Sequence, residues 1–231
     1  MYNAKIIVLD AGHGGTDAGA VNGTRYEKND NLKLALAVQK QLALWGQTVL
    51  MTRTDDTFHS LVSRTDKANA AEADLFVSLH RNSVATATAN GVEIWVYTTA
   101  GSGVQGMAAA VLERIAAVGI QSNRGVKMGN YHVLRESNMP AMLVELGFLS
   151  NTADNRLFDL YFDEYALAIA QGICDALGIQ IGEAEPVPPE ALYRVQVGAF
   201  ASRANAEAFL QTVRGMGLDA FLVSPDENNT K

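Results

Sequence analysis

Two hydrophobic patterns alternate along the first 180 residues. Short runs of Val, Ile and Leu predict buried strands, and between them apolar residues recur every three or four positions, as they do in helices. The strand candidates are 6–10, 48–52, 75–79, 92–97, 132–135 and 142–145, and the helix candidates are 30–44, 102–117 and 163–177. This alternation predicts an α/β fold, with a twisted, mostly parallel or mixed six-stranded sheet and helices on both faces. The direction of the strand at 92–97 stays open.

A change of composition follows the last of these helices. Residues 180–192 contain three of the five prolines and three glutamates, which is typical of a semi-extended linker. Beyond it, alternation from Tyr193, a helical pattern at 203–214 and an apolar run from Leu218 predict a small β-α-β element. We therefore expect a main domain at 1–179, a linker at 180–192, a β-α-β module at 193–224 and a polar tail at 225–231.

Charge and cysteine content narrow the classes of function. The net charge is −7, with 21 acidic against 14 basic residues up to residue 192 and 4 of each after it. Nucleic-acid binding needs a surplus of Lys and Arg, so we expect no nucleic-acid partner. No apolar run approaches the roughly 20 residues that span a bilayer, so we expect no membrane insertion. A single cysteine, Cys174, excludes an internal disulfide and an all-thiolate zinc site, so a bound metal must use histidine and carboxylate.

Three of the predicted strands end in a residue that can bind or serve a metal. His13 follows the first strand in DAGHGG, His80 follows the third in SLHRN, and Glu145 interrupts the apolar run MLVELGFL. Parallel strands place their carboxyl ends at one edge of the sheet, so these segments are expected to converge on one cleft. A carboxylate in an apolar run needs a strong partner or a function. Glu27 lies in a loop, where a carboxylate by itself indicates only a solvated side chain.

Two histidines and one carboxylate are a ligand set of hydrolytic zinc sites, in which a fourth position stays open to water. A second carboxylate nearby can then act as the base. The sequence lacks the H-E-x-x-H of common metalloproteases, the G-x-S-x-G of serine hydrolases and the lysine of a phosphate-binding loop. The residues therefore favour metal-assisted hydrolysis, at a site that differs from the common metalloprotease arrangement, over a serine nucleophile or a phosphate-binding loop.

Four motifs in this order, DAGHGG, a following glutamate in RYEK, SLHRN and LVELGFLSN, resemble the zinc-dependent N-acetylmuramoyl-L-alanine amidases of the type 3 class. The resemblance covers residues 4–178. It implies a mixed sheet flanked by helices, Zn²⁺ held by His13, Glu27 and His80, and Glu145 as the catalytic carboxylate. It also implies that peptidoglycan is the substrate and that the amide between the muramic-acid lactyl group and the L-alanine of the stem peptide is cleaved.

Three further expectations depend on this resemblance. Arg81 stands where the family often has a small residue, and Arg81 and Asn82 are expected to bind substrate, with a solvated side chain as the alternative for Arg81. Some members of the family carry an inserted helix that blocks the site. Residues 83–131 leave little room for such a helix, because one strand, one helix and short loops fill them, so we expect the isolated enzyme to be active without an activator.

Other functions stay open beside the amidase reading. The same metal could serve a zinc peptidase or a deacetylase acting on cell-wall peptides or sugars. A non-catalytic peptidoglycan-binding protein would need no open metal position. Glu145 favours the enzyme, because a binding module has no need of an extra carboxylate there.

The C-terminal element resembles the first half of a SPOR repeat, a module associated with binding peptidoglycan. The complete module resembles two such halves in one sheet. Pairing of two chains into a homodimer is therefore one hypothesis, and a weakly ordered remnant is the other.

The N-terminal residues show no signal-peptide core. We therefore expect synthesis in the cytoplasm and action on the cell wall after release. A phage endolysin that leaves through a holin pore and a sporulation enzyme or autolysin freed by mother-cell lysis would both fit this expectation.

Overall fold

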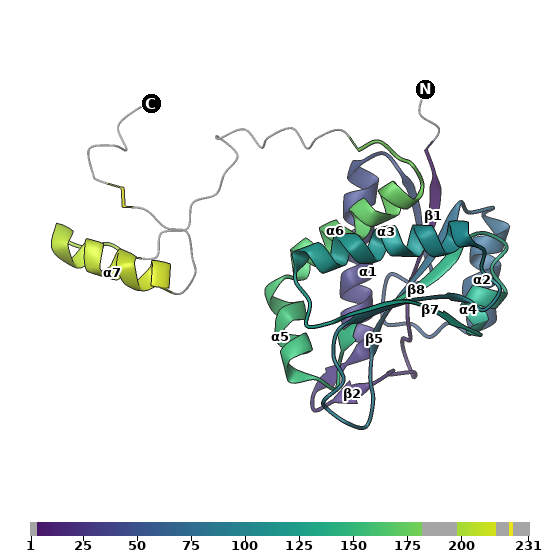
Figure 1. Cartoon of the computed structure of the whole chain (residues 1–231), viewed down its shortest axis with the longest axis horizontal. Coiled ribbons are helices and arrows are strands. Elements are labelled where there is room, and N and C mark those ends of the chain that lie inside the picture. Colours follow the sequence, from purple (N-terminus) through teal and green to yellow (C-terminus); the bar gives the residue numbers. More distant parts are fainter. Residues whose placement is uncertain (1–3, 182–197, 216–221, 224–231) are drawn as a thin grey trace. The chain divides into compact units, whose positions relative to one another are not determined.

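The structure, a computed structural model, describes residues 4–181, 198–215 and 222–223. The chain divides into two units, Met1–Gly182 and Glu183–Lys231. The first unit holds a central sheet covered by helices, and the described part of the second holds one helix (Figure 1).

Most strands of the sheet coincide with the apolar runs, because those runs are buried between layers of helices. The strands are β1 (Ile6–Ala11), β4 (Thr48–Met51), β5 (Leu75–Asn82), β6 (Val92–Tyr97), β7 (Asn123–Gly129) and β8 (Ala141–Phe148). Their order in the sheet is β4-β1-β5-β8-β6-β7. Neighbouring strands are parallel except for β6 and β8, which are antiparallel. The predicted α/β fold with a six-stranded mixed sheet is confirmed, and the direction left open for 92–97 is antiparallel to β8.

Helices cover both faces of this sheet (Figure 1). They are α1 (Glu27–Leu44), α2 (Leu61–Ala70), α3 (Ser102–Val118), α4 (His132–Arg135), α5 (Thr152–Leu160) and α6 (Phe162–Ala176). On one face, α1, α3 and α6 form the larger apolar core, in which Leu34 and Ile169 join Val144 of β8. On the other face, α2 and α4 cover a smaller core that contains Phe76 and Leu143.

The strand predicted at 132–135 is wrong. These residues form the single-turn helix α4, and the sixth strand is β7 instead. Because α4 buries only Val133 and Leu134, its short apolar run cannot distinguish a helix from a strand. β7 lies at the edge of the sheet and is polar and partly exposed, so it lacks the apolar signature of a buried strand.

Other elements went unpredicted for a related reason. The sequence of α2, LVSRTDKANA, has no wide apolar stripe, although the Ser60 hydroxyl caps its start by accepting a hydrogen bond from the Ser63 amide. Helix α5 is likewise capped by the side chain of Asn151. The strands β2 (Val21–Asn22) and β3 (Arg25–Tyr26) form a hairpin too short to show alternation.

One row of residues across the sheet locates the site. His80 on β5 is paired with Glu145 on β8, and Glu145 is paired with Glu93 on β6. Paired residues project from the same face of a sheet, and successive residues along a strand alternate between faces. The three side chains therefore project on the face that α2 and α4 partly cover. The turn after β1 lies beside this row, because the Gly12 amide donates to the Leu79 carbonyl at 3.2 Å.

In the second unit, the described residues form helix α7 (Arg203–Gly215). The rings of Phe200 and Phe209 lie 5.2 Å apart, so the segment before the helix folds back onto it. The strand predicted from Tyr193 and most of the one predicted from Leu218 lie outside the described residues, as do residues 182–192 and the tail at 225–231.

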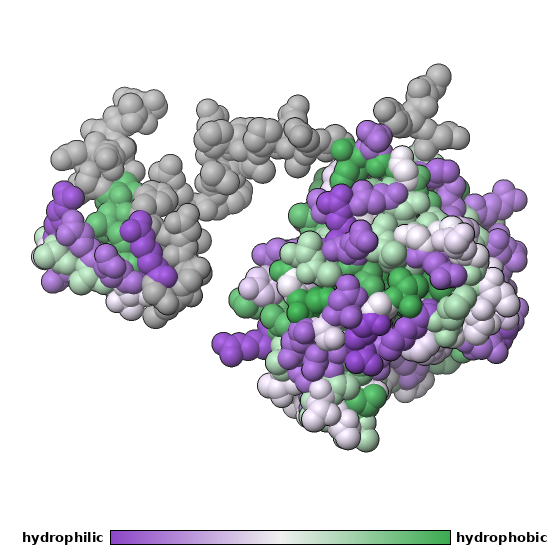
Figure 2. Space-filling view, in the orientation of Figure 1, coloured by the Kyte–Doolittle hydropathy of each residue, from purple (hydrophilic) through white to green (hydrophobic). Residues whose placement is uncertain are grey.

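Among the residues that the structure describes, no helix combines the length and the hydropathy of a membrane span. Figure 2 shows hydrophilic residues spread over the visible face of the larger unit, with small hydrophobic groups between them.

Candidate active site and metal centre

The turn after β1 presents His13 in an unusual backbone conformation. His13 has φ of 62°, and Gly14 and Gly15 also have positive φ, so three consecutive residues leave the regions that most side chains prefer. The His13 ring Nδ1 lies 2.8 Å from Asp17 Oδ2, and its Nε2 lies 3.1 Å from Glu27 Oε2. The carboxylates of Glu27 and Asp17 outweigh burial and raise the pKa of His13 to about 9.

A buried ion pair beneath the turn holds it in place. Asp10 on β1 accepts hydrogen bonds from Thr52 Oγ1 at 2.7 Å, Ser78 Oγ at 2.6 Å and Arg64 Nη1 at 2.7 Å. Arg64, from α2, also donates to the carbonyl of His13 at 2.8 Å through Nη2. Burial opposes ionisation of Asp10, but Arg64 and the hydroxyls outweigh it and lower the pKa of the carboxyl.

Glu27 is the first residue of α1, so its carboxylate lies at the positive end of the helix dipole. It is buried and accepts hydrogen bonds from the Ala20 amide at 2.8 Å, the Arg81 amide at 3.2 Å and Asn31 Nδ2 at 3.2 Å. Burial opposes its ionisation, but the hydrogen bonds with His13 and His80 prevail and lower the pKa of Glu27 well below its usual range. The prediction of a solvated loop carboxylate, made for Glu27 by itself, is wrong.

His80 approaches Glu27 from the other side. Its Nδ1 lies 2.8 Å from Glu27 Oε1, and its ring is nearly perpendicular to that of His13, with 4.9 Å between the ring centroids. Gly12 is required beside it, because a Cβ at that position would overlap the His80 ring. Hydrogen bonding to Glu27 outweighs burial, and the pKa of His80 is raised.

These three side chains fit a zinc ion. One ligand atom from each of His13, Glu27 and His80 lies within 4.8 Å of the others. Tetrahedral zinc with ligands at about 2.0–2.2 Å keeps neighbouring ligand atoms roughly 3.3 Å apart, close to the histidine–glutamate separations found here. Asp17 engages the ring nitrogen of His13 that faces away from Glu27, which is the usual support of a metal-bound histidine.

Glu145 lies next to this cluster in the sheet. Its Oε2 is buried and has no hydrogen-bond partner among the described residues. Burial, with the charges of Glu27 and Glu93 as lesser causes, raises the pKa of Glu145 to about 7. A carboxyl group of this kind can take up and release a proton near neutral pH.

The comparisons with known proteins agree with this geometry. Residues 7–178 match the family described as N-acetylmuramoyl-L-alanine amidase, and residues 189–231 match the SPOR domain. The chain belongs to the N-acetylmuramoyl-L-alanine amidase family. It is therefore a peptidoglycan hydrolase that cleaves the amide between N-acetylmuramic acid and L-alanine.

Individual relatives support this assignment. The chain is 35% identical to N-acetylmuramoyl-L-alanine amidase CwlM of Bacillus licheniformis, over 95% of this chain and 85% of that protein. It is 33% identical to the sporulation-specific N-acetylmuramoyl-L-alanine amidase of Bacillus subtilis, with the same coverage. The crystal structure of an N-acetylmuramoyl-L-alanine amidase from Clostridium difficile 630 matches with a TM-score of 0.73 and 38% identity, over 76% of this chain and 98% of that one.

In this amidase, the side chain of Arg81 lies on the opposite face of β5 from His80. Its side chain is fully buried, donates to Asp30 at 2.8 Å and to Asn155 at 2.7 Å, and lies over the Phe158 ring. Burial lowers the pKa of Arg81 to about 10, which leaves it charged at neutral pH. This position contradicts both predictions for Arg81, which were a contact with substrate and a solvated side chain. It ties the end of β5 to the helix that carries Glu27.

Asn82 lies two residues beyond His80 and donates to Glu93 at 2.9 Å. Its predicted contact with substrate stays a prediction. Sequence reasoning missed Asp17 and the Asp10–Arg64 pair, although an aspartate four residues after a candidate histidine ligand was a usable signal.

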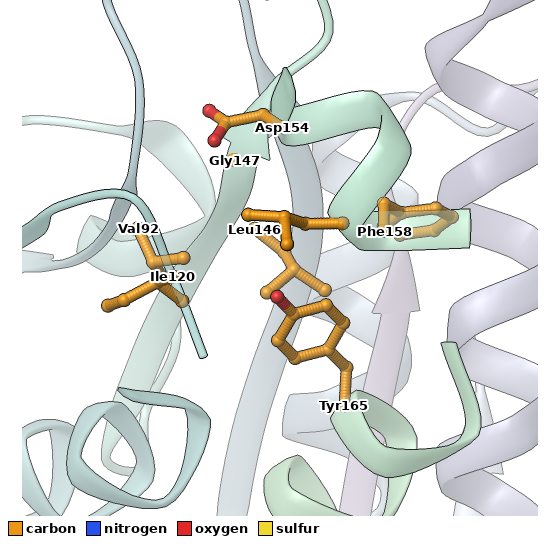
Figure 3. A pocket seen from close by; sticks show the side chains of 8 residues that line it. Val92, Ile120, Leu146, Gly147, Asp154, Phe158 and Tyr165 are labelled. Atoms are coloured by element: carbon orange, nitrogen blue, oxygen red, sulfur yellow. The ribbon is translucent and has the colours of Figure 1, made fainter. Parts of the chain in front are cut away.

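A small cavity lies away from the amidase site (Figure 3). Val92 and Ile120 line one side of it, Phe158 the other, and the Tyr165 hydroxyl donates to the Gly119 carbonyl nearby. At about 10 Å³ it has room for about one water molecule and none for a wall peptide.

Proposed function

We propose that the amidase is zinc-dependent, with His13, Glu27 and His80 as the ligands and Glu145 as the group that moves the proton. The observation that carries this proposal is the cluster of three donor atoms within 4.8 Å of one another, beside a carboxylate whose Oε2 has no partner among the described residues. When bound, zinc supplies Lewis acidity, which acidifies water and polarises an amide carbonyl.

Groups of the protein itself transfer the proton and hold the ligands in position. Glu145 accepts a proton from the attacking water and delivers it to the nitrogen of the departing L-alanine. Asp17 accepts a hydrogen bond from the protonated Nδ1 of His13 and so keeps Nε2 of the ring free as a ligand atom. The amides of Ala20 and Arg81 keep the Glu27 carboxylate turned toward both histidines.

The first test combines metal content with product analysis. Purified protein, with and without a chelator, is incubated with isolated peptidoglycan while turbidity and new amino termini are followed. Release of L-alanine termini without new reducing sugar ends, stopped by chelation and restored by zinc, supports the proposal. Full activity in protein shown by mass spectrometry to contain no metal would contradict it.

Variants separate the two roles. Glu145→Gln is expected to retain zinc and lose turnover, whereas His13→Ala and His80→Ala are expected to lose both. Glu113→Gln, the same chemical change on the exposed face of α3, is the control and should change neither. Zinc occupancy that persists in both histidine variants would refute the ligand assignment.

We also propose that the C-terminal unit pairs with its copy in a second chain. Four apolar side chains of its described residues, Phe200, Phe209, Leu222 and Val223, are between 38 and 44% exposed, which provides apolar surface for an interface. Light scattering should detect a dimer that Phe209→Ser weakens. A monomer at high concentration would rule out this pairing.

A further inference from the structure

A second charged cluster lies beside Glu145, centred on the buried carboxylate of Glu93. Glu93 Oε1 accepts hydrogen bonds from Asn82 at 2.9 Å and from the indole of Trp95 at 3.0 Å. Its Oε2 accepts from Arg124 Nε at 2.6 Å and from Lys127 Nζ at 2.5 Å. All four lone-pair directions of this carboxylate are therefore engaged, and two cations share one of its oxygens.

The cluster carries a surplus of positive charge. Burial opposes ionisation of Glu93, but the hydrogen bonds from Lys127 and Arg124 lower the pKa of its carboxyl, so one negative charge faces two positive ones. The side chains of Arg124 and Lys127 are 33% and 31% exposed, whereas that of Glu93 is 3% exposed. Among the described residues, Nη2 of Arg124 has no hydrogen-bond partner. An anion can therefore reach the cations without displacing Glu93.

The distance between this cluster and the candidate metal site is one that a short extended peptide can span. His80, Glu145 and Glu93 are neighbours in one row, and adjacent strands lie about 4.8 Å apart, so Glu93 lies roughly 10 Å from the histidine. The cleaved amide must lie against His80 and Glu145 for Glu145 to deliver a proton to the amide nitrogen. Because an extended peptide advances about 3.3–3.6 Å per residue, a carboxylate one to three residues away can reach the cations.

We propose that Arg124 and Lys127 bind a carboxylate of the stem peptide and so select for acidic peptides on the L-alanine side of the cleaved bond. The carboxyl of the muramic-acid lactyl group forms the cleaved amide and therefore carries no charge. The peptide thus supplies the anionic groups near this bond. Glu93 holds both cations in position and neutralises one of their two charges. This inference rests on the proposed arrangement of the catalytic site.

The test uses soluble muramoyl tripeptides that differ by one group. One carries free carboxylates, a second has the α-carboxylate of its second residue, a glutamate, converted to an amide, and a third has its C-terminal carboxylate amidated. We expect kcat/KM to fall about 10- to 100-fold for whichever amide removes the bound carboxylate, mainly through KM, because hydrogen bonds to charged groups have that strength. The two amidated peptides distinguish the two sources of the carboxylate.

Variants locate the effect. Arg124→Gln and Lys127→Met are expected to remove most of the discrimination, and Arg124→Lys should restore part of it. Arg114→Gln is the matched control, because Arg114 pairs with Asp175 on the α3 and α6 side and should leave the ratio unchanged. Melting temperatures establish that each variant is folded.

Calorimetric binding of the three peptides to the zinc-loaded Glu145→Gln variant gives the same comparison without turnover. Equal affinity and equal kcat/KM for all three peptides would overturn the inference, as would a ratio that survives both substitutions. Activity without zinc, or activity of the Glu145→Gln variant, would count against the proposed catalytic site instead. The two failures are therefore distinguishable.

Discussion

Removing the carboxylate of Asp10 is expected to cost more stability than any change on the surface. Asp10→Ala leaves Arg64 charged, buried and without its acidic partner, and it also removes the acceptor of two hydroxyl groups. Removing one partner of a buried ion pair typically costs about 3–5 kcal/mol. For a domain of this size each kcal/mol lowers the melting temperature by about 2–4 °C, which predicts a decrease of roughly 6–20 °C.

Denaturant and thermal unfolding followed by circular dichroism measure this cost. Arg64→Met should be similarly destabilising, and the double variant should lose less than the sum of the two, because no unpaired charge is then left buried. Asp175→Asn, at an exposed pair, is the control and should cost less than about 1 kcal/mol. Additive losses, or a loss below 1 kcal/mol for Asp10→Ala, would refute the reasoning.

The same pair predicts a dependence on pH. The pKa of Asp10 is lower in the folded chain than its ordinary value of 3.8, so its contribution to stability is fully present above that value and is lost as the pH falls through the folded pKa. The melting temperature of the wild-type chain should therefore fall more steeply below about pH 4 than that of Asp10→Asn. Parallel curves in acid would contradict this assignment.

The other predictions concern the metal site and its surroundings. Asp17→Asn should weaken zinc binding about 10- to 100-fold in chelator competition, because Asp17 orients the His13 ring; unchanged affinity would remove that role. Gly12→Ala should abolish metal binding in the same assay, since the added methyl group overlaps His80; normal occupancy would contradict this placement. Arg81→Met should cost about 1–3 kcal/mol in urea unfolding, because Asp30 keeps its other partner Arg25, with KM unchanged; a rise in KM would revive the substrate contact. The purified chain should digest peptidoglycan without an added activator, and the need for a second protein would contradict this.

How well each helix or strand could be predicted from the sequence depended on how deeply it is buried. β1, β5 and β8 are enclosed by helices on both faces, so their continuous apolar runs identify them as strands in the sequence. The edge strand β7 and the short helix α4 are each only partly enclosed, and neither leaves a periodic signal. The reversal between β6 and β8 depends on how the chain crosses the sheet, which local pattern does not encode.

The residues of the candidate site also differed in how well the sequence predicted their positions. The convergence of His13, His80 and Glu145 on one edge of the sheet could be predicted, because each interrupts or ends a buried strand. Glu27 was predicted as a ligand only through the resemblance, since a loop carboxylate has the same sequence signature whether it is solvated or buried. Arg81 was misread although alternation along β5 was informative: the residue after His80 must project to the opposite face, toward α1 and α5.

The three candidate ligands come from the turn after β1, the start of α1 and the end of β5, so only the folded chain brings them together. An ion that binds the native state alone stabilises it by mass action, by about 2.7 kcal/mol when its free concentration is 100 times the dissociation constant. With zinc as the bound ion, as proposed above, its availability would affect the lifetime of the folded enzyme as well as its activity. In surroundings poor in zinc, a larger fraction of molecules would be unfolded at any moment and open to proteases.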